Sequence, residues 1–278
     1  MREPPSIEVG AVLSDRYELV APIAEGSMGD VYQAWDQAAL RHVAIKVLRA
    51  EYLADDAMRR RFRREAAVLK ALDHPAIVRL IDFEIQPSGL VFLVTELVQG
   101  GTLAARIREA PLDVSSAGAV LEPLADALHA AHAHGVLHGD LKPANVLWVE
   151  GQPRLIDFGA SKILGIDRLT ATGEVAGTPA YMAPEVLTGK GDVDQRIDVY
   201  GLGVVLYEAL SGKHPFQDAH VGRLLLKIDA GDHLPLHRVC EVTASLAAVV
   251  HRAMHRDPSL RFDDVRALVR AWNGALAG

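Results

Sequence analysis

The sequence predicts an α+β fold in two parts, a small sheet with one helix followed by a larger region that is mainly helical. Three observations predict it. Strand-like apolar runs fill residues 17–98, helical patterns prevail in the rest of the chain, and Gly100 and Gly101 mark the junction. Glycine accepts backbone angles that other residues resist, so we expect a hinge there. We place the first part at 1–98, including a short N-terminal extension, and the second at 99–278.

The first part combines several strand-like runs with one helical segment. Between residues 55 and 72, apolar side chains recur at helical spacing, with Met58, Phe62 and Leu69 on one face. The other runs have the length and composition of strands, so we expect a small sheet carrying one helix. In chain order these runs are YELVAPI, DVYQAW, HVAIKVL, IVRLIDFEI and LVFLVTELV.

The second part shows helical periodicity in several long stretches. The most apolar one, DVYGLGVVLYEALSG, is interrupted by Glu208 and is shorter than the roughly 20 residues needed to cross a bilayer. We therefore expect it to form a buried helix. The helical stretches cover residues 116–135, 199–210, 246–255 and 263–276.

Composition excludes several classes of protein. With 278 residues, 50% of them hydrophobic, the chain can bury a large core. Its formal net charge of -7 opposes binding to phosphate backbones, so we expect no nucleic-acid partner. The single cysteine, Cys240, cannot form an intramolecular disulfide, and the N-terminal stretch MREPPSIEVG lacks the apolar core of a secretory signal. We therefore expect a cytoplasmic protein.

A glycine-containing hairpin is expected in IAEGSMGDVYQAW, where Gly26 and Gly29 lie between two strand-like runs. Because these residues lack side chains, backbone N–H groups could approach a phosphate closely. On this stretch alone, an ordinary hairpin is the commoner explanation. The phosphate interpretation therefore depends on the residues that follow.

A lysine and a glutamate interrupt two apolar patterns nearby. Lys46 lies inside the run HVAIKVL, and Glu65 lies on the apolar face of the helix that follows. A buried ammonium group and a buried carboxylate each need a partner, so the two are candidates for one ion pair. The alternative is a lysine on the solvent face of an edge strand. The arginines at 59–61, 63 and 64 are interpreted as a solvated helix face and receive no role.

The stretch VLHGDLKPANVLW places Asp140, Lys142 and Asn145 within six positions, and Asp157 follows a short apolar run in RLIDFGASK. Asn145 and Asp157 carry the oxygen ligands that Mg²⁺ prefers, which leaves Asp140 to orient a hydroxyl group. For each residue alone, a loop cap is the simpler explanation. The order of the features favours chemistry, because the glycine hairpin, strand lysine, helix glutamate and polar loop are followed by DFG and APE.

With these motifs, the sequence resembles the eukaryotic-like (Hanks-type) bacterial Ser/Thr protein kinases from residue 17 to about residue 272. The similarity is clearest in HPAIVRLIDF, GTPAYMAPE and DVYGLGVVLYEALSGKHPF. The resemblance implies a two-lobed protein-kinase-like fold. Its N-lobe, at 1–98, would contain an antiparallel sheet plus one helix, and its C-lobe, at 99–278, would be mainly helical. Together the lobes would form one catalytic domain.

The resemblance implies ATP as phosphoryl donor and Mg²⁺ as metal ion, with Mn²⁺ as an alternative. Lys46 would hold the α- and β-phosphates and pair with Glu65. Asp140 would accept or orient the proton of the substrate hydroxyl, and Lys142 would stabilise charge on the γ-phosphoryl group. The metal ligands would be Asn145 and Asp157.

The resemblance also outlines a nucleotide site. Gly26 and Gly29 would cover the phosphates, and Thr95 matches the gatekeeper position. Apolar side chains would enclose the adenine, and the backbone of two residues would hydrogen-bond it. The enclosing side chains are those of Ile23, Val31, Ala44 and Leu147, and the backbone groups belong to Glu96 and Val98.

The implied reaction transfers the γ-phosphoryl group of ATP to Ser or Thr hydroxyls of protein substrates. Autophosphorylation is also implied, with a homodimer for the reaction in trans and membrane attachment only through a segment outside this chain. The alternative is a pseudokinase, a nucleotide-binding scaffold of the same fold, but such proteins typically have lost Lys46, Asp140 or Asp157. A small-molecule phosphotransferase of related fold would lack GTPAYMAPE.

One departure from the kinase pattern concerns regulation. Gly139 stands where most similar kinases have an Arg that grips a phosphate on the activation segment. Thr170 and Thr172 match autophosphorylated threonines of similar kinases, although an ordinary polar loop would explain them too. Because this arginine is missing, we expect activity to depend less on phosphorylation of the activation segment. Three further residues match scaffold positions, namely the ion pair Glu185 and Arg261 and the loop anchor Asp198.

Overall fold

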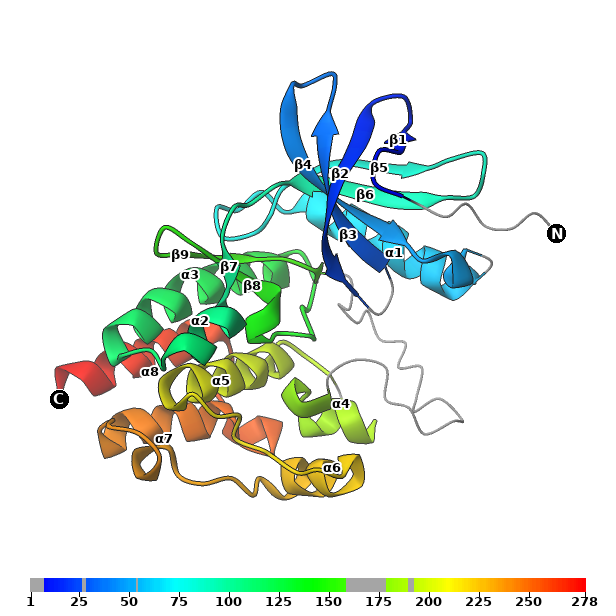
Figure 1. Ribbon diagram of the computed structural model, residues 1–278. Coiled ribbons are helices and arrows are strands. Elements are labelled where there is room, and N and C mark those ends of the chain that lie inside the picture. Colours follow the sequence, from blue (N-terminus) through cyan, green and yellow to red (C-terminus); the bar gives the residue numbers. More distant parts are fainter. Residues whose placement is uncertain (1–7, 27–28, 54, 159–178, 190–192) are drawn as a thin grey trace. The chain divides into compact units, whose positions relative to one another are not determined.

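The chain divides into two compact units, one ending at Gln99 and the other beginning at Gly100 (Figure 1). The first unit is built mainly from strands, and the second mainly from helices. The computed structural model describes residues 8–26, 29–53, 55–158, 179–189 and 193–278.

The first unit contains a six-stranded sheet in the order β1-β2-β3-β4-β6-β5. Each strand pairs antiparallel with its neighbours, and β4 lies inside the sheet between β3 and β6. The strands are β1 (Val12–Leu13), β2 (Tyr17–Glu25), β3 (Gly29–Asp36), β4 (Arg41–Leu48), β5 (Leu80–Ile85) and β6 (Val91–Glu96). The antiparallel sheet predicted for the first part is confirmed.

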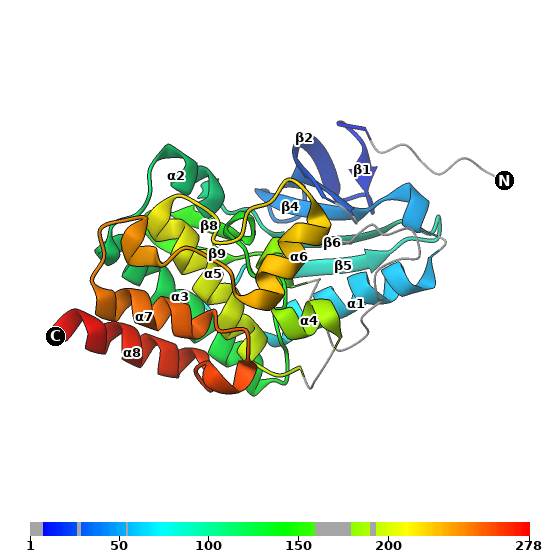
Figure 2. The same cartoon turned by 90° about the horizontal axis from the view of Figure 1, so that it is seen from below.

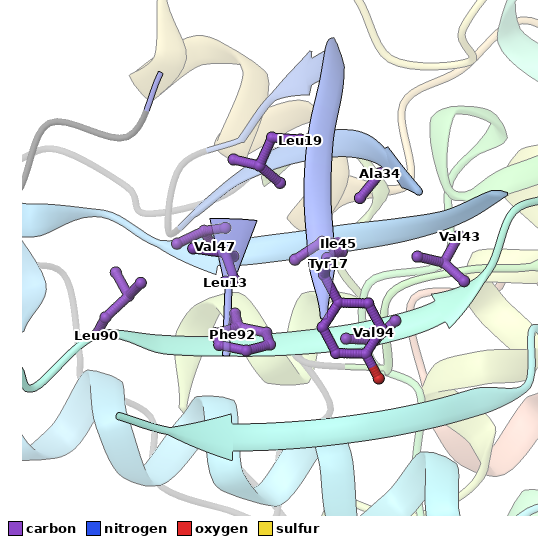
Figure 3. Packing of buried hydrophobic residues seen from close by; sticks show 10 residues of the cluster. All are labelled: Leu13, Tyr17, Leu19, Ala34, Val43, Ile45, Val47, Leu90, Phe92 and Val94. Carbon is purple, nitrogen blue, oxygen red and sulfur yellow. The ribbon is translucent and has the colours of Figure 1, made fainter. Parts of the chain in front are cut away.

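Side-chain alternation gives this sheet two faces with different neighbours. One face carries a buried apolar cluster in which the rings of Tyr17 and Phe92 meet edge to face at 6.2 Å. Because successive residues point to opposite faces, Ala44 and Lys46 lie on the face away from this cluster. Figure 3 shows the cluster members, which are Leu13, Tyr17, Leu19, Ala34, Val43, Ile45, Val47, Leu90, Phe92 and Val94.

Helix α1 (Asp56–Ala71) packs against the second face of the sheet. Its N-terminus is capped by Asp55, whose carboxylate accepts hydrogen bonds from the backbone N–H groups of Ala57 and Met58. Phe62 is fully buried and anchors the helix to the sheet. Its buried apolar partners are Leu48, Val91 and Leu93.

In the second unit, helix α5 (Arg196–Ser211) forms the centre. Nearly all of its residues are buried, and α3, α7 and α8 pack around it (Figure 2). The buried helix predicted for this stretch is therefore confirmed. The other helices of the unit are α2 (Leu103–Glu109), α3 (Val114–Ala133), α4 (Pro184–Thr188), α6 (Val221–Ala230), α7 (Ala244–Ala253) and α8 (Val265–Ala277).

A small antiparallel sheet in the second unit positions the polar loop of the sequence motif. Its strands are β7 (Gly101–Thr102), β8 (Val146–Val149) and β9 (Gln152–Leu155), in that order. A single 3₁₀ turn, Pro143–Asn145, leads directly into β8, and β9 ends two residues before Asp157. Pairing of β8 with β9 therefore brings the loop and Asp157 close together.

Short 3₁₀ helices complete the described secondary structure, at Ala50–Tyr52, Pro179–Tyr181, Leu236–Arg238 and Pro258–Leu260. Across the described ranges, no helix combines the length and apolar character needed to span a membrane. A sheet with one helix followed by a mainly helical unit is the α+β arrangement that the sequence predicts.

Candidate active site

The candidate site residues fall into two sets, one in each unit. In the second unit, Asp198 in the first turn of α5 anchors the loop that carries Asp140. Its buried carboxylate accepts hydrogen bonds from the backbone N–H groups of His138, at 2.9 Å, and Gly139, at 2.8 Å. These two residues directly precede Asp140, so α5 fixes the backbone beneath the candidate catalytic side chain. The predicted anchoring role of Asp198 is confirmed.

A histidine that sequence reasoning missed supports Asp198. Nε2 of His132, in α3, lies 2.7 Å from Oδ2 of Asp198, and both side chains are almost fully buried. Burial opposes ionisation of Asp198. The hydrogen bond from His132, electrostatic attraction to His132 and His138, and the backbone hydrogen bond from Gly139 together outweigh burial and hold the pKa of Asp198 below its ordinary value. The available signal was a histidine on the apolar face of a predicted helix, one turn after the buried Leu128.

The carboxylate of Asp140 is held through one of its two oxygens. Lys142 Nζ donates to Oδ2 at 2.7 Å, and Asn145 Nδ2 donates to the same oxygen at 3.1 Å. Asn145 Nδ2 also donates to the backbone oxygen of Asp140 at 2.9 Å. The other carboxylate oxygen, Oδ1, is buried and accepts no hydrogen bond within the described part of the chain. Leaving a buried oxygen without a hydrogen-bond donor costs free energy, so Oδ1 is suited to accept a hydrogen bond from a substrate hydroxyl.

Asp157 has an unusual backbone conformation, with φ at +66°. Such angles are uncommon for residues other than glycine and cluster at functional sites. The backbone N–H of Ile156, which precedes Asp157, donates to the carbonyl of Asn145 at 3.0 Å. This hydrogen bond joins the two backbone segments that carry the predicted metal ligands. Asn145 uses its amide nitrogen on Asp140, which leaves the amide oxygen as a ligand.

These oxygen donors fit a hard divalent cation such as Mg²⁺, which proteins bind through few side chains together with nucleotide phosphates. Among the residues that the structure describes, no group of three or more His, Cys, Asp or Glu side chains is arranged to hold a metal ion. The candidate metal site thus consists of one amide and one carboxylate, Asn145 and Asp157.

Gly139 has a backbone reason for being glycine. Its φ is +71°, in the left-handed region where an L side chain costs roughly 1–2 kcal/mol. In this conformation its N–H reaches Asp198 without strain. The sequence shows Gly139 only as a missing cation, because a left-handed angle at that position cannot be deduced from one sequence.

Two side-chain pairs support the scaffold. Arg261 donates to both carboxylate oxygens of Glu185 at 2.7 Å, which confirms the predicted ion pair, and both side chains are buried. Sequence reasoning missed the second pair, in which the hydroxyl of Tyr181 donates to Glu208 Oε2 at 2.6 Å. Burial raises the pKa of both Tyr181 and Glu208. This pair ties the 179–181 turn to α5.

In the first unit, Lys46 and Glu65 form the predicted ion pair. Lys46 Nζ donates to both carboxylate oxygens, at 2.9 and 3.0 Å, and joins β4 to α1. The ammonium group also lies 5.6 Å from the ring centroid of Phe62, a favourable cation–π distance. Because β4 lies between β3 and β6, the alternative of an edge-strand lysine is wrong.

The glycine hairpin needs its glycines for close backbone packing. The N–H of Gly26 donates to the carbonyl of Gly29 at 3.1 Å. A Cβ at Gly26 would lie 2.7 Å from that carbonyl oxygen, and a Cβ at Gly29 would clash with the carbonyl oxygen of Val47. An ordinary hairpin would share this requirement, so the phosphate role of both residues stays a prediction.

Two residues predicted to contact adenine, Val31 and Ala44, share one face of the first unit's sheet with Lys46. Val31 pairs with Lys46 across the ladder, and Ala44 precedes Lys46 by two residues, so the three side chains point the same way. The roles of all six predicted adenine contacts stay predictions. The others are Ile23 in β2, Glu96 at the end of β6, Val98 after it, and Leu147 in β8 of the second unit.

The predicted regulatory residues Thr170 and Thr172, and Thr178 of the GTPAY motif, lie outside the described residues. Autophosphorylation at Thr170 or Thr172, and a weaker dependence of activity on that phosphate, therefore stay predictions.

Comparison with known proteins identifies the family. The protein kinase domain family matches residues 17–272, and the chain belongs to that family. The chain is 38% identical to the Ser/Thr-protein kinase PknA of Mycobacterium tuberculosis, over 96% of this chain and 64% of PknA. It is 38% identical to PknB of Mycolicibacterium smegmatis, over 94% of this chain and 44% of PknB. It is 36% identical to pkn2 of Myxococcus xanthus, over 94% of this chain and 32% of pkn2.

A solved structure agrees with this assignment. The PknI kinase domain of Mycobacterium tuberculosis aligns with a TM-score of 0.79 and 29% identity, covering 98% of this chain and 100% of that domain. The predicted kinase fold and the resemblance to bacterial Ser/Thr kinases are confirmed. Membership of the family implies ATP and a divalent cation. The chain spans between 32% and 64% of the length of the three curated relatives.

Proposed function

We propose that this chain transfers the γ-phosphoryl group of ATP to Ser or Thr hydroxyls of protein substrates. The observation that carries the proposal is the state of Asp140. One carboxylate oxygen is held by Lys142 and Asn145, while the other is buried and lacks a donor among the described residues. The names of the bacterial relatives support Ser and Thr as acceptors.

In the proposed reaction, Oδ1 of Asp140 accepts the hydroxyl proton as the hydroxyl oxygen attacks the γ-phosphorus. The bond from the γ-phosphorus to the bridging oxygen breaks, and ADP leaves with its electron pair. Lys142, 2.7 Å from Asp140, stabilises the negative charge that spreads over the transferring group. Positioned proton transfer of this kind contributes about 10²–10⁴-fold to the rate.

The same proposal assigns the cofactor contacts. Lys46 would bind the α- and β-phosphates while Glu65 orients its ammonium group. Asn145 and Asp157 would bind the divalent cation, which we propose is Mg²⁺, with Mn²⁺ as an alternative. A bound cation would neutralise charge on the phosphates.

A nucleotide-binding pseudokinase is the alternative function. It is less well supported, because Lys46, Asp140 and Asp157 are all present. The closed Lys46–Glu65 pair points the same way. A homodimer for phosphorylation in trans, a cytoplasmic location, and membrane attachment through a segment outside this chain stay predictions from sequence.

The test is incubation with γ-labelled ATP and a generic protein acceptor, with Mg²⁺ or Mn²⁺, followed by phosphoamino-acid analysis. We expect labelled phosphoserine or phosphothreonine from the wild type and from Asp229→Asn, a matched control at an exposed site in α6. Asp140→Asn should lose the label while still binding nucleotide. Nucleotide binding without any phosphoryl transfer by the wild type would favour the pseudokinase and contradict the proposal.

A further inference from the structure

A basic pocket lies on the exposed side of α1, away from the Lys46–Glu65 pair. Arg59, Arg60 and Arg63, together with Asp56, line a hollow of about 310 Å³. Residues three and four apart share one face of a helix, which explains why these four side chains converge. We define these four residues as the arginine pocket.

The arginine pocket holds an excess of positive charge. Its single carboxylate, Asp56, is 79% exposed and lies 3.9 Å from Arg59, a distance and exposure at which an ion pair contributes little. Like charges three or four residues apart destabilise a helix by a few tenths of a kcal/mol. Convergence of three guanidinium groups therefore does not serve the stability of α1. It is also a local exception in a chain with a net charge of -7.

The side chains, rather than the helix end, would contact an anion here. Asp55 already accepts hydrogen bonds from the N–H groups of Ala57 and Met58. Two of the backbone N–H groups that have no partner within the helix are thus already bonded to Asp55. What remains for a ligand is a set of guanidinium groups, whose planar donors match the oxygens of a phosphate.

We propose that Arg59, Arg60 and Arg63 bind the phosphate of a phosphoserine or phosphothreonine residue in a protein that has already been phosphorylated. Such a group carries roughly -1.5 to -2 charges, enough to offset the excess in the arginine pocket through charge-assisted hydrogen bonds. The volume is at the lower end for ligand sites, which suits one phosphorylated side chain. The net charge of the chain opposes nucleic acids and anionic membranes.

The choice of phosphoserine or phosphothreonine rests on the proposed function, because these residues are its products. Binding a phosphorylated region of a substrate would raise the local concentration of the remaining acceptor hydroxyls. The arginine pocket would thus favour repeated phosphorylation of one partner over phosphorylation of many.

Binding is tested by fluorescence anisotropy with a short labelled peptide that carries a central phosphothreonine flanked by Gly and Ser. The full chain without nucleotide should bind it about tenfold or more tightly than the unphosphorylated peptide or one with Glu in place of the phosphothreonine. Combined Arg59→Gln, Arg60→Gln and Arg63→Gln should weaken binding by about tenfold or more. Lys70→Gln, a control on the exposed side of the last turn of α1, should change it less than about twofold.

Two further variants test the chemistry. Asp56→Asn should tighten binding by about twofold, because it removes the only carboxylate of the arginine pocket. Replacing the three arginines by lysines should give intermediate affinity, because charge remains but the paired guanidinium contacts are lost. Circular dichroism of each variant checks that the helices remain folded.

Equal binding of the phosphorylated and unphosphorylated peptides would overturn the proposal, as would unchanged phosphopeptide binding by the triple Gln variant. Stronger competition by phosphatidylserine vesicles or duplex DNA than by phosphopeptide would also overturn it, in favour of a polyanion site. These measurements involve no turnover. Phosphopeptide binding that depends on the arginines, in a chain without kinase activity, would therefore contradict the proposed function and leave the arginine pocket standing.

Discussion

The two units of the molecule hold their candidate site residues in different ways. In the first unit, one ion pair joins β4 to α1, and the Lys46 side chain stays 14% exposed. In the second unit, Asp198 lies in the central helix and is 1% exposed. Its carboxylate accepts two backbone hydrogen bonds from the loop that carries Asp140. The first pair joins two elements, with Glu65 only 2% exposed and Lys46 partly open to water, whereas Asp198 lies wholly within the core of its unit.

We infer from this difference that the Lys46–Glu65 contact can open, whereas the loop held by Asp198 cannot. A small shift of α1 would break the Lys46–Glu65 pair and let Lys46 reach water. Loss of the contacts to Asp198 would leave two backbone N–H groups unpaired inside the protein, at a cost of about 1–3 kcal/mol each. We therefore hypothesise that the position of α1 is the on/off coordinate of this kinase domain, while the Asp140 loop stays fixed.

The largest effect is expected where the chemistry is removed and the scaffold is kept. Asp157→Asn should lower kcat/KM by about 10³-fold, equivalent to about 4 kcal/mol in the barrier, because the carboxylate proposed to bind the metal becomes neutral. Asn tolerates positive φ, so the backbone at +66° should survive. Steady-state kinetics and thermal unfolding check both parts. Wild-type activity in this variant would refute the proposed metal role.

The second effect concerns the scaffold of the Asp140 loop. Asp198→Asn should lower the free energy of unfolding by about 3 kcal/mol, because the buried charge that holds two N–H groups and His132 is lost. Denaturant titration measures the loss. Asp126→Asn, an exposed carboxylate in α3, is the matched control and should change stability by less than about 0.5 kcal/mol. Equal losses in the two variants would show that Asp198 is no special anchor.

The pH dependence of stability provides an independent check on Asp198. Its pKa is lowered from 3.8 in the folded chain, so its contribution to stability is fully present above about pH 4. That contribution is lost as the pH falls through the lower folded value. The wild type should therefore lose stability more steeply below about pH 4 than Asp198→Asn does, as measured by unfolding at a series of pH values.

The third effect tests the contact that can open. Glu65→Gln should lower the phosphorylation rate by about 10- to 100-fold, or about 1.4–2.7 kcal/mol, because Lys46 is oriented less firmly. The free energy of unfolding should change by less than about 1 kcal/mol, since an amide oxygen can still accept from Lys46 and the ammonium group can reach water. A collapse of stability together with activity would make Glu65 a structural core residue and end the comparison with Asp198.

Much of the fold and several site contacts were predictable from the sequence, because each unit has clear periodic patterns. The helix around Phe62 and the buried helix α5 were predictable, since both repeat apolar residues at helical spacing. The pairs Lys46–Glu65 and Glu185–Arg261 were also predictable, because their members stand in recognisable motifs.

The missed features depend on tertiary contacts or on backbone angles. His132 reaches Asp198, 66 residues away, and Tyr181 reaches Glu208 across a turn and a helix. The position of His132 on an apolar helix face indicates burial, but no local pattern shows which residue either His132 or Tyr181 contacts. The arginine pocket was interpreted as a solvated face, because the sequence shows arginines in a row but not which of them converge on one hollow.

The smallest effect concerns Gly139, where the fixed loop depends on a backbone angle rather than a side chain. Gly139→Ala should lower the free energy of unfolding by about 1 kcal/mol, because alanine resists a φ of +71°. Gly139→Asn should cost less, since asparagine enters the left-handed region more readily. Gly151→Ala, at an exposed turn with φ at +82° and nothing near its Cβ position, is the matched control and should cost a similar amount.

The two alanine variants should differ in kinetics. Only Gly139→Ala disturbs the N–H that Asp198 holds next to Asp140, so only it should reduce the phosphorylation rate, by about two- to tenfold. If Gly139→Ala lost no more activity than Gly151→Ala, the left-handed angle would serve the fold alone, and the loop would position Asp140 without help from Gly139.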